Sequence, residues 1–164
     1  MTTERRTDPT LPSRTGSEPI VGDRMAVEPI VVQASATLSE AAALMDRNRI
    51  HGLPVVDGSG SLVGVLSQTD LARARATEYL WANWPGLAVR HLMTSPAVTV
   101  QRSTPLAIAA MKMERQRIHR LVVVDDLDPT IPIGVLSMTD LVHAIVLETG
   151  GDAGPGEPGG PAGA

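Results

Sequence analysis

Apolar residues follow a helical period in some segments of the chain and form short β-branched runs in others. The segment 37–48 spaces Leu38, Ala41 and Met45 three or four residues apart, which predicts an amphipathic helix. Runs such as "PIVV" at 29–32 are short and β-branched, which is typical of strands. Together these patterns predict a mixed α/β fold.

The pattern occurs twice, and the two copies are similar in sequence. "RIHGLPVVD" at 49–57 matches "RIHRLVVVD" at 117–125, and "GVLSQTDL" at 64–71 matches "GVLSMTDL" at 134–141. Each copy predicts the order strand, helix, strand, turn, strand, helix. The second motif is shifted by two residues more than the first, so the added residues belong to the turn between them.

Capping residues mark where the predicted helices begin. Thr37 and Glu40 have the spacing of a capping box, and Pro105 suits the first position of a helix. The second helix of each copy is expected to begin after Ser67 or Ser137, directly behind the returning strand. Residues close together in the sequence therefore predict where the helices of both copies begin.

The two ends of the chain have compositions that do not suit a packed core. Residues 1–19 are rich in Thr, Pro, Arg and Glu, and residues 149–164 are almost entirely Gly, Pro, Ala and acidic residues. We expect both ends to be disordered. We expect one repeat at 20–80, a linker at 81–90 and the second repeat at 91–148.

The segment that joins the repeats contains both tryptophans of the chain. "ATEYLW" at 76–81 is expected to continue the helix before it, and the Pro and Gly of "WANWPG" at 81–86 are expected to end it. We expect Trp81 and Trp84 to cover the core between the repeats. A binding patch for a protein partner is the alternative, because two exposed tryptophans in one short segment are costly.

Composition and charge exclude several kinds of site. The 164 residues carry a net charge of −4, with a sequence pI near 5.5, which gives no general attraction to nucleic acid or to an anionic membrane. Cysteine is absent, which excludes disulfides, thiolate metal sites and a thiol nucleophile. The beginning, "MTTERRTDPT", lacks the apolar core of a secretory signal, and no stretch approaches the roughly 18 apolar residues of a spanning helix. We therefore expect a cytoplasmic protein.

Neither a catalytic set nor a metal site is expected. Asp, His and Ser recur, but they recur with the repeat and show no separate arrangement of base and nucleophile. The histidines His51, His91, His119 and His143 include no close metal-binding spacing. Phenylalanine is absent, so the core is aliphatic and a nucleobase would lie between aliphatic side chains.

The repeated Ser-x-Thr-Asp motif has two interpretations. In the first, it only begins a helix: Ser67 accepts a hydrogen bond from the amide of Thr69 or Asp70, and the carboxylate interacts favourably with the positive end of the helix. In the second, the free amides between the strand and the helix form a binding site for a ligand. The motif alone does not decide between the two.

The second interpretation assigns parts of a nucleotide to the residues around the motif. An aspartate accepts two hydrogen bonds and suits a vicinal diol such as that of ribose, whereas it would repel a phosphate. The phosphate would then meet His119 and Arg120, with Arg117 nearby, because a guanidinium binds phosphate through two hydrogen bonds. The first repeat has His51 and Gly52 at the matching positions. We therefore expect tighter binding in the site that Arg120 reaches.

The duplicated pattern resembles a pair of CBS domains, the Bateman module. In that family a strand and an amphipathic helix precede a "PVVD"-like run, and a "Ghh(S/T)xxD" run opens the last helix, as in "RIHGLPVVD" with "GVLSQTD" and "RIHRLVVVD" with "GVLSMTD". "HLMTSPAVTV" at 91–100 resembles the usual entry to a repeat, and "DRMAVEPIVV" at 23–32 is its less regular partner. The resemblance covers residues 20–147. Val122, where the first repeat has Pro54, is a departure that alters one pocket wall.

The resemblance implies an α/β (α+β) fold of two repeats related by a pseudo-twofold axis, each strand-helix-strand-strand-helix, with the sheets packed together and the helices outside. Two clefts between the repeats would bind AMP, ADP, ATP or S-adenosylmethionine, and no cofactor would be required. Aspartates would hold ribose, basic side chains would meet phosphate, and apolar side chains would line the adenine pocket. The implied ligand-binding residues are Ile30, Val31, His51, Ser67, Thr69, Asp70, Ala97, Val98, His119, Arg120, Ser137, Thr139 and Asp140.

The implied function is that of a regulatory module. It would sense adenine nucleotides and signal to an unknown protein partner by a conformational shift, without catalysis of its own. Family members commonly associate through their helices, so a homodimer is expected, and neither nucleic acid nor a membrane is expected as a partner. A ligand-independent scaffold for protein interaction is the alternative, and an enzyme is the weaker third hypothesis.

Overall fold

The computed structural model of the chain describes residues 18–76 and 86–149. The sequence predictions for Trp81 and Trp84, and those for almost all of the two ends, concern residues outside these ranges. Within them the chain forms two sheets, each accompanied by helices, and the mixed α/β fold class predicted from the sequence is confirmed.

The first repeat forms a three-stranded sheet with two helices. Strand β3 lies in the middle, parallel to β2 on one side and antiparallel to β4 on the other. Along the chain the elements are β2 (Val32–Gln33), α1 (Leu38–Asn48), β3 (Gly52–Val56), β4 (Leu62–Ser67) and α2 (Gln68–Ala76).

The second repeat copies this arrangement and adds one strand. Strand β6 lies parallel to β5 and antiparallel to β7, and the two-residue strand β1 pairs with the other side of β7, which gives the order β1-β7-β6-β5. The elements are β1 (Ala26–Val27), β5 (Thr99–Gln101), α3 (Leu106–Gln116), β6 (Arg120–Val124), β7 (Pro132–Ser137) and α4 (Met138–Thr149).

The predicted helix starts are confirmed with small shifts. Thr37 and Glu40 form the capping box at α1: the Glu40 amide donates to Oγ1 of Thr37 at 3.1 Å, and the Thr37 amide donates to Oε2 of Glu40 at 2.7 Å. Pro105 is the N-cap of α3 rather than its first helical residue. The strand expected at 29–32 begins only at Val32, because the residues before it make no ladder hydrogen bonds.

The segment that leads into each repeat packs against the other repeat. Val21, in the short helix η1 (Val21–Asp23), is buried in the core of the second repeat, and its amide donates to the carbonyl of Thr104 at 2.8 Å. Val89, in η4 (Val89–His91), is buried in the core of the first repeat, and its amide donates to Ala36 at 2.8 Å. The two repeats are therefore joined by an exchange of these entry segments.

Each "GVL" glycine lies where an exchanged segment crosses a strand. A Cβ atom on Gly64 would lie 2.7 Å from the carbonyl oxygen of Thr94, and one on Gly134 would lie 2.8 Å from that of Ala26. Real Cβ atoms essentially never come so close to other heavy atoms. The repeated glycine is therefore explained by close backbone packing, and not by a ligand.

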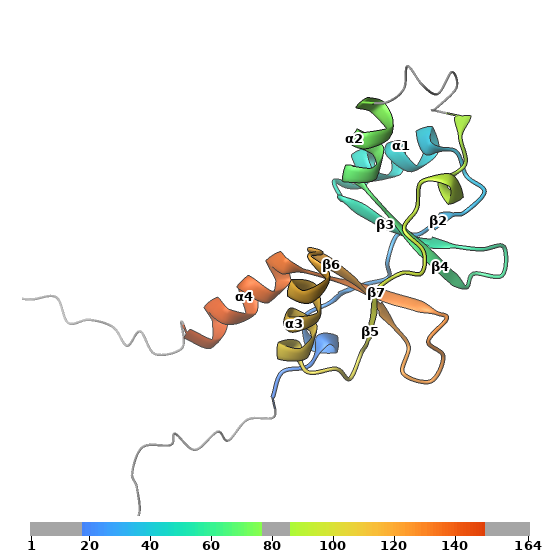
Figure 1. Ribbon diagram of the computed structural model, residues 1–164. Helices are drawn as coiled ribbons and strands as arrows, with labels where there is room; N and C mark the ends of the chain where they lie inside the picture. The colour runs from blue at the N-terminus through green and yellow to red at the C-terminus, as the bar shows by residue number, and fades with distance from the viewer. Residues whose placement is uncertain (1–17, 77–85, 150–164) are drawn as a thin grey trace, which may run out of the picture.

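The strands of the two repeats meet in the middle of the molecule, as Figure 1 shows, with α1 and α2 at one end and α3 and α4 at the other. Each repeat has a separate aliphatic core. Leu53 and Leu66 are fully buried in the first, and Leu121 and Leu136 in the second. Because each half is stabilised by its own core, the space between them is free to form a site.

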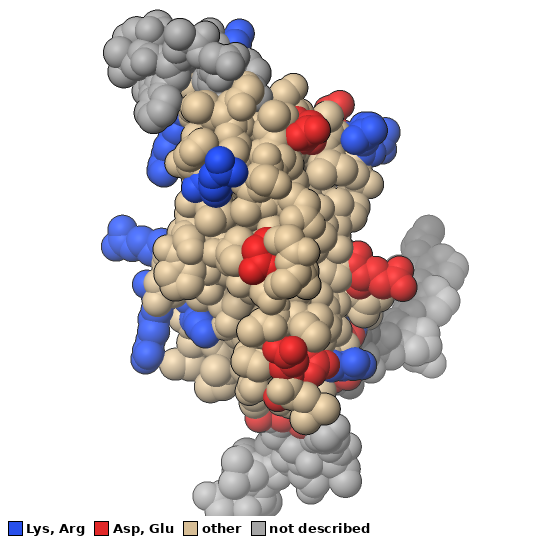
Figure 2. Space-filling model, turned by 90° about the vertical axis from the view of Figure 1, so that its right-hand side faces the viewer, with Lys and Arg blue, Asp and Glu red and all other residues tan. Residues whose placement is uncertain are grey.

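Figure 2 shows the side of the molecule that carries the turns of the two hairpins. This face is mostly uncharged, with basic side chains mainly along one border and acidic ones toward the other side and the bottom. In the turns, Asp57 accepts hydrogen bonds from the amides of Ser59 and Ser61, and Asp125 accepts from those of Leu127 and Asp128. Those carboxylates stabilise the predicted turns locally.

Gly134→Ala is expected to destabilise the protein by about 1–3 kcal/mol, because the new Cβ atom would overlap the backbone of the exchanged segment. Gly64→Ala is expected to act in the same way on the other repeat. Gly58→Ala is the control, because a Cβ atom there would meet no atom within 4 Å. Chemical denaturation followed by circular dichroism measures the free energies of unfolding, and equal stability of the three variants would contradict the close approach.

Candidate functional site

A pocket of about 390 Å³ lies where the two repeats meet. This volume is within the range of small-molecule sites, roughly 300–1,000 Å³. The first repeat contributes the start of β3 and the start of α2, and the second contributes the segment before β5 and the residues around the start of β6. The pocket brings together these predicted site residues: His51, Ser67, Thr69, Asp70, Ala97, Val98, His119 and Arg120.

The other predicted site residues do not line this pocket. They are Ile30, Val31, Ser137, Thr139 and Asp140. By the repeat, the start of α4 matches the start of α2, and Ile30 matches Val98, so all of these residues except Val31 are equivalents of residues that line the pocket. Ile30 and Val31 are each 37% exposed. Their predicted roles remain predictions.

Several lining residues were not predicted from the sequence. Thr94 belongs to the exchanged segment and pairs with Val65 of β4, a contact that no local pattern indicates. Arg73 lies three residues after Asp70 on α2, so helical spacing alone could have suggested that they share a face. Further unpredicted lining residues are Leu53, Val65, Gln68, Ile118, Leu121 and Val135. Gly52, Pro54, Arg117 and Val122, which the sequence analysis named, also line the pocket.

The Ser-x-Thr-Asp motif does begin a helix in both repeats. Asp70 accepts two hydrogen bonds at Oδ2, from the amide of Ser67 at 2.8 Å and from its hydroxyl at 2.7 Å, and its own amide donates to Oγ of Ser67 at 3.2 Å. Ser137 and Asp140 repeat this geometry at 2.7, 2.7 and 3.3 Å. The capping interpretation is therefore confirmed.

The cap leaves part of each aspartate available. Within the described part of the chain, all the side-chain hydrogen bonds of Asp70 go to Oδ2, and Oδ1 accepts none. Asp70 is half-buried and lines the pocket, so this second oxygen can accept hydrogen bonds from a ligand. Capping and ligand binding are thus compatible functions of one carboxylate.

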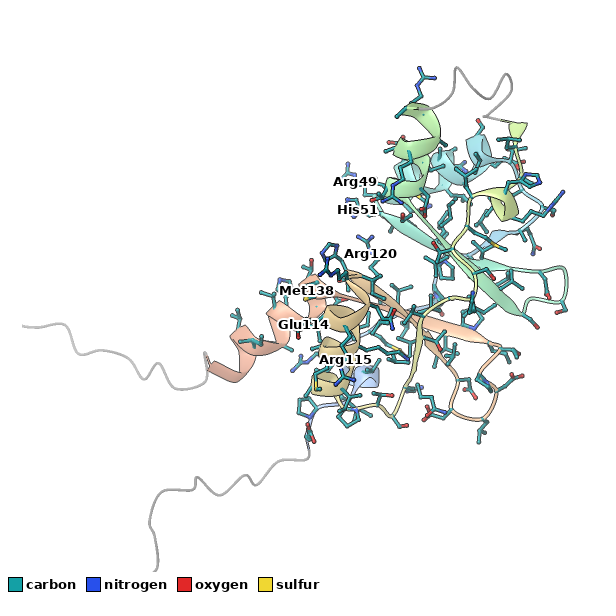
Figure 3. All side chains as sticks on the ribbon, in the orientation of Figure 1. Arg49, His51, Glu114, Arg115, Arg120 and Met138 are labelled. Atoms are coloured by element: carbon teal, nitrogen blue, oxygen red, sulfur yellow. The ribbon has the colours of Figure 1, made fainter. Side chains whose placement is uncertain are left out.

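Arg120 crosses from the second repeat to the first. Its Cα atom pairs with that of Ser137 on β7, yet its guanidinium reaches β3, because a Cβ atom placed on Gly52 would lie 3.7 Å from Nη1 of Arg120. Figure 3 shows Arg120 pointing from β6 toward the end of the first repeat that carries Arg49 and His51. The absence of a side chain on Gly52 leaves room for this guanidinium.

The guanidinium of Arg120 is half-buried, and the described part of the chain gives it no hydrogen bond or ion pair. Burial lowers the pKa of Arg120, while the negative charge of Asp140 opposes that change. A charge that has lost water and gained no hydrogen bond in exchange favours binding of an anion.

Aliphatic side chains form another part of the pocket wall. Pro54, Ala97, Val98, Ile118 and Val122 all line it. Pro54 and Val122, the pair in which the repeats differ, both belong to this one pocket. A flat apolar group such as a nucleobase fits between such side chains without an aromatic platform.

The sequence matches the model of the CBS domain twice, over residues 21–77 and 89–147. The chain belongs to the CBS domain family. The two matches correspond to the two repeats, each with its own sheet and pair of helices.

Solved structures of other CBS pairs share the fold. The CBS domain pair of protein MJ0100, in complex with 5'-methylthioadenosine and S-adenosyl-L-methionine, has a TM-score of 0.71 and 26% identity, over 79% of this chain and 98% of that chain. CBSX2 in complex with AMP has a TM-score of 0.69 and 33% identity, also over 79% of this chain and 98% of that chain. Each bound ligand contains an adenosine moiety.

Curated relatives are much longer than the matched region. Homoserine O-acetyltransferase of Methanocorpusculum labreanum is 34% identical over 128 residues, which are 78% of this chain and 24% of that protein. The chain thus spans about a quarter of the length of this relative. The described helices include none that is long and apolar enough to cross a membrane, and the described residues form no cluster of His, Cys, Asp and Glu that could hold a metal.

Arg120→Met is expected to raise the free energy of unfolding of the ligand-free protein by about 0.5–1 kcal/mol, because it removes a half-buried charge that has no partner. Arg115→Met is the control, because Arg115 is exposed on α3 and lies away from the pocket. Urea denaturation of the two variants measures the difference. A loss of stability specific to Arg120→Met would show that the guanidinium supports the fold itself.

Proposed function

We propose that this CBS pair binds an adenine nucleotide or a related adenosyl compound in the pocket between its repeats and acts as a regulatory module. The single observation that carries the proposal is the half-buried guanidinium of Arg120, which makes no hydrogen bond or ion pair among the described residues and lines the pocket together with the start of α2. The adenosyl ligands of the CBS pairs of MJ0100 and CBSX2 support the same chemistry.

The pocket suits the three parts of a nucleotide. Oδ1 of Asp70 would accept from the ribose hydroxyls, with Ser67 and Thr69 beside it. Arg120 and His119 would contact phosphate. The base would lie against the aliphatic wall, of which Ala97, Val98 and Val122 are part. None of these contacts requires a cofactor.

Such a ligand would contact both repeats at once. Asp70 belongs to the first repeat and Arg120 to the second, so a ligand held between them favours one relative arrangement of the repeats. A partner that binds that arrangement better would receive the signal. The partner would be another protein or a further domain, and catalysis would reside there and not in this module.

Helix α4 is the part of the molecule best suited to a homodimer. Its exposed face is apolar, with Val142, Ile145, Val146 and Leu147 between 51% and 62% exposed. Helix α2 has Ala72, Arg75 and Ala76 at the positions that match Val142, Ile145 and Val146. Two copies related by a twofold axis would place the same uncharged face of α4 against itself, which buries apolar surface without opposing charges.

A ligand-independent scaffold is the second candidate. The apolar face of α4 favours it, since that face can bind another protein whether or not the pocket is filled. The two functions differ in one observable. A scaffold keeps the same stability and the same partner affinity when adenine nucleotides are added, and a sensor does not.

Calorimetry and thermal-shift measurements on nucleotide-stripped protein test the binding function. The ligands are AMP, ADP, ATP, S-adenosylmethionine, a guanine nucleotide and zinc. We expect selective binding of adenine compounds with micromolar to millimolar dissociation constants and a rise in melting temperature. Absence of binding across this panel would leave the scaffold as the better account.

Arg120→Ala is expected to weaken ATP binding by about tenfold and to leave adenosine binding within about twofold, because a hydrogen bond to a charged group contributes about 1.5–3 kcal/mol. Calorimetric titration of both ligands into Arg120→Ala measures the two affinities. Arg115→Ala, on the exposed side of α3, is the control. Equal losses for ATP and adenosine would remove Arg120 from the phosphate.

Val142→Glu is expected to convert a dimer into a monomer, because it places two like charges in the centre of the proposed interface. Ala72→Glu is the matched control at the equivalent exposed position of α2. Light scattering coupled to size-exclusion chromatography gives the molar masses. A monomeric wild-type protein would contradict the proposed dimer.

A further inference from the structure

The two halves of the molecule are nearly equivalent around the starts of α2 and α4. The caps have the same hydrogen bonds with lengths that differ by 0.1 Å or less. Arg49 and Arg117, which end α1 and α3, both have a φ angle of 52°. His51 matches His119 in the repeat. The equivalence breaks at the next position, where the first repeat has Gly52 and the second has Arg120.

The broken equivalence has a spatial consequence. Gly52 and Arg120 begin the middle strands β3 and β6, and the side chain of Arg120 extends over Gly52. A Cβ atom on Gly52 would contact the guanidinium at 3.7 Å, so a longer side chain there would occupy the same space. The side chain of Arg120 therefore occupies the space that a side chain at position 52 would need.

The direction in which the Arg120 side chain extends determines where its positive charge lies. The side chain lines the pocket that contains Asp70, whereas Asp140 does not line that pocket, although its negative charge also acts on Arg120. By the pseudo-twofold axis, an arginine at position 52 would extend toward the start of α4 and line the cleft of Asp140. The position of one guanidinium thus distinguishes the two otherwise similar helix starts, because it lines the pocket of Asp70.

We propose that the Gly52 and Arg120 pair selects the cleft that binds the phosphates of a nucleotide, so that a polyphosphate binds at Asp70 and not at Asp140. This inference rests on the proposed nucleotide-binding function and goes beyond it. The fold has two matching helix starts, at α2 and α4, and Arg120 adds a positive charge to the pocket at only one of them, the start of α2. Exchanging the two residues then transfers ATP to the other cleft.

The test compares Asp70→Asn with Asp140→Asn in two backgrounds, with ATP as the ligand. Asparagine keeps the cap, because its side-chain oxygen still accepts from the serine amide. In the wild-type background, Asp70→Asn is expected to lower ATP affinity by about tenfold, and Asp140→Asn by less than about threefold. In the Gly52→Arg/Arg120→Gly background the two effects are expected to exchange.

Calorimetry gives the affinity and the number of ATP molecules bound per chain, and circular dichroism shows that each variant is folded. A folded double variant that binds no ATP, or whose binding still depends on Asp70, overturns the inference while the proposed function stands. ATP binding by neither protein overturns the proposed function.

Arg120→Gly alone is a second test that adds no side chain to the crowded position. Its ATP affinity is expected to fall about tenfold, and the effects of Asp70→Asn and Asp140→Asn on the remaining affinity are expected to become equal within about threefold. An Arg120→Gly protein that keeps the preference for Asp70 overturns the inference, because the preference would then come from other residues of the pocket.

Discussion

The exchange of entry segments is the constraint on which the rest of the molecule depends. Val21 and Val89 are both fully buried. Val21 precedes the first repeat but lies in the core of the second, and Val89 precedes the second repeat but lies in the core of the first. The chain then continues from Val89 through Thr94, which pairs with β4, to Ala97 and on into β5. The wall of the pocket is therefore the continuation of a segment that is held in the opposite core. A cavity between two loosely joined domains would change shape freely, whereas this one is bounded by a segment that is held in a core of the molecule.

The sequence predicted what depends on local physics. The helix starts followed from Thr37 and from the Ser-x-x-Asp spacing, since capping involves residues three positions apart. The duplication itself predicted the order of elements in each half. What could not be predicted depends on contacts between the halves: the exchange of η1 and η4, the short β1, and the cleft that Arg120 enters. Arg120 stands beside "SMTD" in its own sheet but lines the pocket of "SQTD", and only the arrangement of the two sheets shows this.

The site is compatible with the fold because each of its polar groups is only partly used by the fold. Oδ2 of Asp70 closes the cap and Oδ1 does not, so the carboxylate is held in one orientation before any ligand arrives. Such preorganisation reduces the ordering cost of binding. Arg120 is different, because no hydrogen bond or ion pair within the described residues fixes its guanidinium, and its burial is unfavourable in the absence of an anion. A ligand whose anionic group pairs with Arg120 therefore gains more binding free energy than a ligand that contacts only groups with existing hydrogen bonds.

Duplication explains why the residues that distinguish the two halves are those at which the repeats differ. Residues that both halves need for folding match, as Gly64 matches Gly134 and Ser67 matches Ser137, and these cannot distinguish one cleft from the other. The differences between Gly52 and Arg120, between Pro54 and Val122, and between the polar α2 and the apolar α4 leave the cores unchanged. A pair of identical repeats would have two equal clefts and two equal outer faces. A difference at one strand position and along one helix is enough to make the two halves chemically distinct, with an arginine in the pocket between the repeats and an apolar surface on α4.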